Sequence, residues 1–169
     1  KPVLIELSET VAPLSPNRWR EINTMTISFG HGLAVSPLHL VAGVSAIVNG
    51  GIYRYPTLIK RDTNTHGPGK RIISLETYLK MRRLMRLVVD KGTGQKAVAP
   101  GFLVGGKTGT AEKVSGRGYH RKALISSFVA AFPMNKPRYV VLAMLDEAKG
   151  TKETFGYATG GWVAAPVVG

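Results

Sequence analysis

The chain has 169 residues, of which 44% are hydrophobic and 20% charged, a composition typical of a globular protein long enough for one domain with its own core. A net charge of +13 permits an anionic partner such as nucleic acid, a membrane surface or a small substrate, and says nothing about the fold. The absence of cysteine excludes disulfides and thiolate metal sites.

The first half of the chain predicts one helix between irregular segments. Prolines at three positions argue against a long helix in the first 35 residues, and Phe29-Gly30-His31-Gly32 predicts a turn. Ser36-Pro37 then predicts a helix start, with a serine N-cap and proline at the first helical position. This helix is apolar nearly all round, so we expect it to be buried, and it ends at Asn49-Gly50-Gly51. An extended piece, residues 52–59, and a polar loop, residues 61–70, follow.

A second helix is predicted over residues 75–90, with Ser74 as its N-cap. Its apolar face has the i, i+3, i+4, i+7 spacing and comprises Tyr78, Met81, Leu84, Met85 and Val88. Its basic face comprises Lys80, Arg82, Arg83 and Arg86. We interpret this basic face as solvated surface rather than as a binding stripe.

Three strands are predicted next, over residues 104–114, 123–132 and 138–145. The short connections between them contain glycine and proline, which favours an antiparallel meander in a mixed α/β (α+β) fold. The final residues, 160–166, are helix-forming, but we expect the stretch to be too short for a helix. Trp19 and Trp162 are expected to be core anchors.

The run Lys107-Thr108-Gly109-Thr110 combines one cation, two hydroxyls and accessible backbone. One interpretation is nucleotide binding, because Gly101 to Lys107-Thr108 fits the P-loop pattern G-x-x-x-x-G-K-T and Asp146 ends an apolar strand, as Mg²⁺-binding acids do. The context fits poorly, since a P-loop follows a strand and opens a helix. Here Pro100-Gly101 precedes the run, and a turn at residues 115–118 leaves no room for a helix.

The other interpretation is acyl transfer by an active-site serine. Lys-Thr-Gly on a strand is one of three sequence elements of penicillin-binding proteins and class A β-lactamases. Gly109 lets a substrate approach the strand closely. The Thr108 and Thr110 hydroxyls can hold a carboxylate, with Lys107 adding positive charge. The Thr110 N–H can donate to an oxyanion, an interaction that lowers a barrier by about 3 to 4 kcal/mol.

Longer segments resemble, in the same order, the class B penicillin-binding proteins, and most closely the cell-division type, the septal peptidoglycan D,D-transpeptidases. The Ser-Phe-Gly-His-Gly segment favours division over elongation. The resemblance covers residues 3–169. Its motifs are residues 28–32 and 35–38, 49–51, 91–97, 105–113 and 160–167.

The resemblance implies that residues 1–169 are the C-terminal part of one transpeptidase domain, in which an antiparallel meander packs with helices and the sheet is incomplete. It implies that Lys107, Thr108, Gly109 and Thr110 bind the D-Ala-D-Ala end of a stem peptide or a β-lactam, with the Thr110 N–H as oxyanion donor. Gly92 and Gly94 resemble the loop on one side of the cleft.

The resemblance also implies a setting and partners. It places the protein at the periplasmic face of the bacterial inner membrane, with its anchor outside this chain, in contact with division-machinery proteins. The four histidines lack metal-ligand spacing, and no metal or cofactor is expected. Nucleic-acid motifs are absent, so only non-specific binding to nucleic acid is expected.

The chain departs from the family pattern at the nucleophile. None of the nine serines has lysine three residues later, so the Ser-x-x-Lys element is not in this sequence, and Ser15-Pro16-Asn17 matches Ser-x-Asn only by chance. We therefore expect residues 1–169 alone to be inactive. We also expect this piece to be marginally stable or self-associating, because its strands would expose an edge and an uncovered face where the preceding part of the domain packs.

Overall fold

The computed structural model describes residues 1–60, 69–115 and 118–169, and next to the second gap it describes side chains only up to Lys113 and from Ala123 onward. Most of the predicted polar loop at residues 61–70 therefore lies outside the described residues. The longer helices and strands fall where the sequence predicts them, and they place the Lys107–Thr110 run on a sheet edge.

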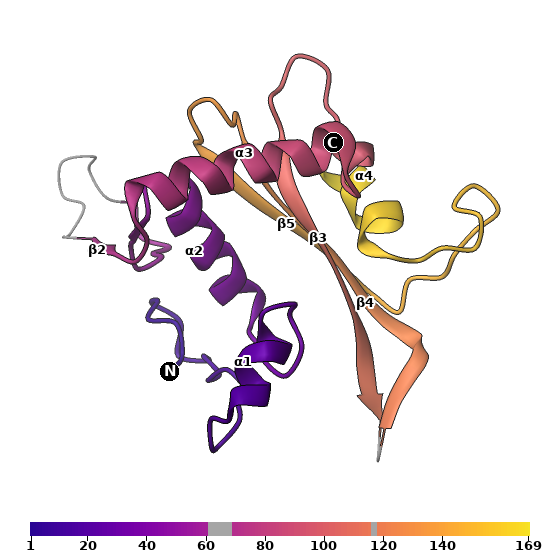
Figure 1. The fold of residues 1–169 in the computed structure, drawn as a ribbon, viewed down its shortest axis with the longest axis horizontal. Helices are drawn as coiled ribbons and strands as arrows, with labels where there is room; N and C mark the ends of the chain where they lie inside the picture. The colour runs from indigo at the N-terminus through magenta and orange to yellow at the C-terminus, as the bar shows by residue number, and fades with distance from the viewer. Residues whose placement is uncertain (61–68, 116–117) are drawn as a thin grey trace.

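The sheet is an antiparallel meander, which confirms the prediction. Its strands are β3 (Gly105–Ser115), β4 (Gly118–Phe132) and β5 (Tyr139–Asp146), in the order β3-β4-β5 (Figure 1). Gly109 of β3 lies opposite Ser127 of β4, and the register shifts after Glu112. The free edge of β3 consequently carries the Lys107–Thr110 run.

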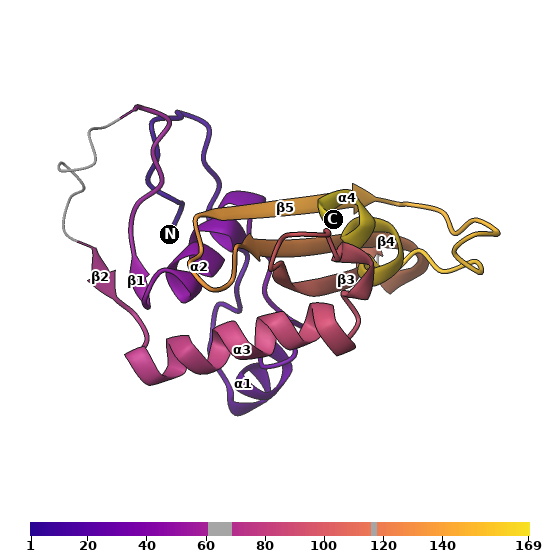
Figure 2. The same cartoon turned by 90° about the horizontal axis from the view of Figure 1, so that it is seen from above.

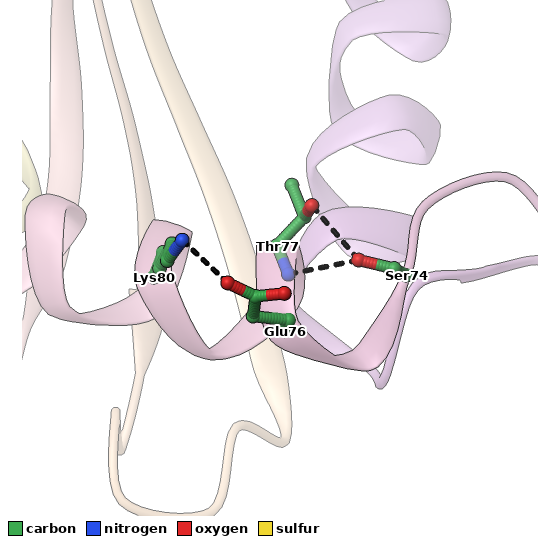
Figure 3. A network of polar contacts seen from close by, with 4 residues as sticks. All are labelled: Ser74, Glu76, Thr77 and Lys80. Atoms are coloured by element: carbon green, nitrogen blue, oxygen red, sulfur yellow. Dashed lines mark hydrogen bonds and ion pairs between the residues drawn. The ribbon is translucent and has the colours of Figure 1, made fainter.

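The two predicted main helices are also confirmed. In α2 (Pro37–Val48) the His39 N–H donates to the Ser36 hydroxyl at 3.3 Å, as an N-cap requires. In α3 (Leu75–Lys91) the Thr77 N–H donates to the Ser74 hydroxyl at 3.1 Å. The first turn of α3 is supported further by an ion pair of 2.6 Å between Glu76 and Lys80 (Figure 3).

Both faces of the sheet are packed against other segments. The C-terminal segment lies on one face and α2 on the other (Figure 1). Because side chains alternate along a strand, neighbouring residues of β4 enter different cores. The first core contains Val89, Ala97, Val104, Phe128, Ala130, Ala164 and Ala165. The second contains Val44, Val48, Met85, Val129, Ala131 and Met134.

The prediction for the C-terminal segment is wrong. Gly160–Ala164 form a π-helical turn (η3), which continues into the short helix α4 (Ala165–Val168). Ala164 and Ala165 are fully buried in the core around Phe128. Tertiary packing therefore stabilises a helix too short to be stable by itself.

The N-terminal half contains elements that the sequence did not predict. A short helix, α1 (Glu21–Ile27), lies below α2 in Figure 1, and the strands β1 (Ile52–Tyr53) and β2 (Lys70–Arg71) form a two-residue antiparallel pair. The expected extended piece at residues 52–59 is thus a strand only at its start. Trp19 is 59% exposed, so the prediction that it anchors the core is wrong.

The basic face of α3 is only partly solvated, which corrects the interpretation from the sequence. Lys80 and Arg83 are exposed, whereas Arg82 and Arg86 are half-buried. The Arg82 guanidinium donates to the Met134 carbonyl oxygen at 2.9 Å, and Arg86 donates to the carbonyl oxygen of Val104, immediately before β3. These arginines fix the start of β3 and the turn after β4 to α3. Figure 2 shows α3 lying next to β3.

Candidate functional site

The Lys107–Thr110 run lies in the middle of an extended edge strand. β3 continues to Ser115 and returns through β4, so no helix follows the run. Asp146 ends β5 and forms an ion pair with Lys113 at 2.9 Å. A P-loop needs a helix N-terminus facing the phosphates, so the nucleotide-binding interpretation is wrong.

A cavity of about 520 Å³ that contains several hydroxyl groups lies beside this run. Its walls come from β3, from the loop after α3 and from the C-terminal segment. The lining residues are Gly92, Thr93, Gln95, Lys96, Thr108, Thr110, Thr159, Gly161 and Trp162. Of the two glycines that the resemblance placed beside the cleft, Gly92 lines this cavity, whereas Gly94 is buried against the Phe128 ring.

Hydrogen bonds join the three walls of the cavity. The Thr93 and Thr108 hydroxyl oxygens are 2.8 Å apart, which connects the loop after α3 to β3. The Gly160 N–H donates to the Thr110 hydroxyl at 3.0 Å, which connects the C-terminal segment to the same strand. Both predicted threonines therefore face one cavity, and each has a fixed partner.

Close backbone packing explains the glycines around the site. A Cβ on Gly109 would lie 2.5 Å from the Ser127 hydroxyl, so a side chain there would force that hydroxyl to move. A Cβ on Gly160 would lie 2.3 Å from the Ser127 carbonyl oxygen and 2.4 Å from that of Gly109. On Gly161 it would lie 2.3 Å from the Thr93 carbonyl oxygen. Gly160 thus lets the C-terminal segment pack directly on the sheet, and Gly161 lets it pack on the loop after α3. The sequence did not predict this role.

Lys107 is separated from the two threonines. Its side chain lines a second cavity, of about 770 Å³, which is called the apolar groove from here on. The residues of this groove are Leu40, Val44, Ile47, Met81, Leu84, Met85, Leu87, Val88, Lys91, Gly92, Gly106, Lys107 and Val129. The Lys107 ammonium is exposed and donates to the Thr108 carbonyl oxygen at 2.8 Å. The structure therefore places the predicted cation and the predicted hydroxyls at two different cavities.

An aromatic group borders the cavity lined by Thr108 and Thr110, which is called the threonine cavity from here on. The Trp162 ring stacks on Tyr157 with centroids 5.6 Å apart and meets the edge of Phe155 at 5.7 Å. The Lys96 ammonium lies 4.4 Å from the Trp162 ring centroid, within the range of a cation–π contact. Trp162 is half-buried. The sequence did not predict that the cavity would be lined by Trp162, Lys96, Thr93 and Thr159.

The described residues contain neither a group of three or more metal-ligating His, Cys, Asp or Glu side chains nor a helix long and apolar enough to span a membrane. An antiparallel sheet with threonines on its free edge, packed between helices, is the arrangement expected for a penicillin-recognising transferase. The sequence profile of the penicillin-binding protein transpeptidase domain matches residues 1–169. The chain belongs to this family.

Individual relatives agree with the family assignment. A probable peptidoglycan D,D-transpeptidase FtsI from Caulobacter vibrioides is 43% identical, and the match covers 100% of this chain and 30% of that protein. The transpeptidase domain of Burkholderia pseudomallei penicillin-binding protein 3 has a TM-score of 0.85 at 37% identity, over 98% of this chain and 50% of that one.

Penicillin-binding protein 3 from Mycobacterium tuberculosis, in its complex with aztreonam, has a TM-score of 0.82 at 28% identity. This likeness covers 96% of the present chain and 40% of that one. The chain thus spans half or less of the relatives it matches. These likenesses confirm the predicted resemblance to class B penicillin-binding proteins and the predicted fold class.

Proposed function

We propose that the chain is the C-terminal part of a serine D,D-transpeptidase domain, which cross-links the stem peptides of peptidoglycan and is acylated by β-lactams. The observation that carries the proposal is the cavity at the free edge of β3, where Thr108 and Thr110 face the same space. Hydroxyl donors aligned on an open strand edge suit a ligand that is itself a short extended peptide ending in a carboxylate.

Each residue of the run has a role in this proposal. Thr108 and Thr110 donate hydrogen bonds to the carboxylate of D-Ala-D-Ala or of a β-lactam, and Gly109 lets the ligand approach the strand closely. In an antiparallel edge strand alternate N–H groups point away from the partner strand. The Thr110 N–H supplies one donor to the oxyanion of the tetrahedral intermediate. Lys107 faces the apolar groove, where the nucleophile element packs.

The nucleophilic serine is supplied by a preceding part of the domain, since no Ser-x-x-Lys is present in residues 1–169. That serine attacks the carbonyl carbon of the ligand, the leaving amine departs with a proton, and the acyl group stays on the serine oxygen until a second amine displaces it. Residues 1–169 then supply recognition and oxyanion stabilisation.

Acylation by a fluorescent penicillin tests this function. The probe is expected to label, in an SDS-resistant manner, a chain extended upstream to include a Ser-x-x-Lys, and to leave residues 1–169 unlabelled. Unlabelled penicillin added first should block the signal. Labelling of the short chain would contradict the missing nucleophile, and a folded extended chain that stays unlabelled would contradict the function.

The proposed setting is the periplasmic face of the bacterial inner membrane at the division septum, with division-machinery proteins as partners. Its support is the Ser-Phe-Gly-His-Gly segment at residues 28–32 and the likeness to a protein named FtsI. A fluorescent fusion of the complete protein is expected to gather at midcell in dividing cells. An even distribution around the cell envelope would contradict this setting.

A further inference from the structure

We propose that Lys96 is the cation that recognises the carboxylate of the ligand in the threonine cavity, and that it thereby sets specificity for anionic acyl donors. The inference rests on the proposed function and adds a residue that the Lys107–Thr110 run does not contain. It divides the two charges of the site, with Lys96 at the threonine cavity and Lys107 at the apolar groove.

The first argument is the position of the ammonium group. Lys96 lines the same cavity as Thr108 and Thr110, and its ammonium is 4.4 Å from the centroid of the Trp162 ring, which also lines that cavity. A cation–π contact holds the ammonium over the ring and leaves its hydrogen-bond donors available. The described residues contain no ion pair of Lys96 with a carboxylate.

The second argument is the hydrogen-bonding balance of the cavity. The Thr93 and Thr108 hydroxyls share one hydrogen bond, so one of their two protons remains available. Thr110 accepts from the Gly160 N–H, so its own proton is available too. No aspartate or glutamate is among the described residues that line the cavity. A cavity with surplus donors, one ammonium and no acid fits an anion.

The third argument is the rigidity of the segment that carries Lys96. The short 3₁₀ helix Gln95–Ala97 (η2) is fixed on both sides. Ala97 is fully buried in the core, and a Cβ on Gly94 would lie 2.8 Å from the Phe128 ring. The backbone of Lys96 therefore sits at a fixed distance from the sheet, as a preorganised ligand contact requires.

Acylation kinetics of the complete transpeptidase domain test the proposal. The probes are benzylpenicillin and its methyl ester, which lacks the negative charge. In Lys96→Met, which keeps an apolar stem over Trp162, the second-order acylation rate constant for benzylpenicillin is expected to fall about tenfold at low salt. Lys96→Arg is expected to remain within about twofold of the wild type. The loss should shrink as salt is raised, because the charge is exposed.

The ester and a matched variant separate recognition from structure. Lys136→Met removes the same charge from an exposed position in the turn between β4 and β5 and is expected to leave both rates unchanged. With the ester, wild type and Lys96→Met should acylate equally. If Lys96→Met slowed acylation by benzylpenicillin and by its ester equally, or slowed neither, the proposed role of Lys96 would be overturned. A wild-type domain that benzylpenicillin does not acylate would instead contradict the proposed function itself.

Discussion

The two cavities beside β3 differ in how much of their environment this chain supplies. Three segments joined by hydrogen bonds form the walls of the threonine cavity, and the Tyr157 and Trp162 rings at its border stack on each other. The groove between α2 and α3 is apolar, and Leu84, which lines it, is 55% exposed. We therefore expect the threonine cavity to bind the ligand, and we expect the apolar groove to be covered by another segment of the domain.

The largest effect is expected where the C-terminal segment crosses the sheet at the threonine cavity. In the complete domain, Gly160→Ala should reduce the free energy of unfolding by about 3 kcal/mol, because its Cβ would collide with the carbonyl oxygens of Gly109 and Ser127. The acylation rate should fall as well, since the Gly160 N–H fixes Thr110. Urea denaturation and fluorescent penicillin labelling measure the two effects.

Gly43→Ala is the matched control for this glycine. Gly43 lies in α2, and beyond the backbone of its own helix no atom lies within 4 Å of the place where a Cβ would stand. Alanine there should raise the free energy of unfolding by about 0.5 to 1 kcal/mol, through the higher helix propensity of alanine. If the two variants proved equally stable, the close packing at Gly160 would not be what closes the threonine cavity.

A polar substitution tests whether a preceding segment covers the apolar groove, when it is made both in residues 1–169 alone and in the complete domain. Leu84→Gln should cost less than about 0.5 kcal/mol in residues 1–169, where the side chain is exposed. In the complete domain it should cost about 2 kcal/mol, because the preceding segment then buries it. Thermal melts of both chains measure the difference.

Leu79→Gln is the control on the same helix, since Leu79 is exposed and does not line the groove. It should have the same small effect in both chains. The longer chain should also melt more cooperatively than residues 1–169, which we predict to be marginal or self-associating in size-exclusion chromatography. A cooperative, monomeric melt of the short chain would show that the groove needs no cover.

A smaller effect is expected from the hydroxyl pair at the threonine cavity. In the complete domain, Thr93→Val removes the 2.8 Å contact with Thr108 and should cost about 1 kcal/mol of stability. Thr93→Ser keeps the hydroxyl and should cost less. If the Val and Ser variants were equally stable, the Thr93–Thr108 hydroxyl pair would contribute nothing to the stability of the wall between the loop and β3. Urea denaturation of both variants decides this.

The sequence predicted the elements whose determinants are local. Ser36-Pro37 and Ser74 identify two helix starts because the capping groups lie within the first turn. Short turns identify the meander, since antiparallel strands need little chain between them. The Lys107–Thr110 run was likewise predicted to lie on a strand, and it lies on β3 at the edge of the sheet.

The remaining features depend on contacts between distant segments. Ala164 and Ala165 are helical because they are buried against Phe128, which no local pattern reveals. Lys96 meets Trp162 only because the C-terminal segment returns across the sheet. The paired glycines before Trp162 were the available signal, since adjacent glycines often mark close backbone approach.

The smallest effect is expected at the far end of β3, where a surface ion pair supports the sheet. The hydrogen bonds that Lys113 donates to Glu147, at 2.8 Å, and to Asp146 raise the pKa of Lys113 above its ordinary value. A raised pKa in the folded state means that the charged lysine stabilises the fold below its unfolded-state pKa of about 10.4, and that this contribution is lost as the pH rises through the folded-state pKa.

Thermal melts should therefore show Lys113→Met slightly less stable than wild type at pH values below about 10, with the two curves converging at higher pH. Added salt should reduce the difference, because the pair is partly exposed. Lys149→Met removes an exposed charge from the loop after β5 and serves as the control, with no such convergence expected. A difference that persisted at high pH would mean that the aliphatic stem of Lys113, rather than its charge, holds the end of β3 against β5.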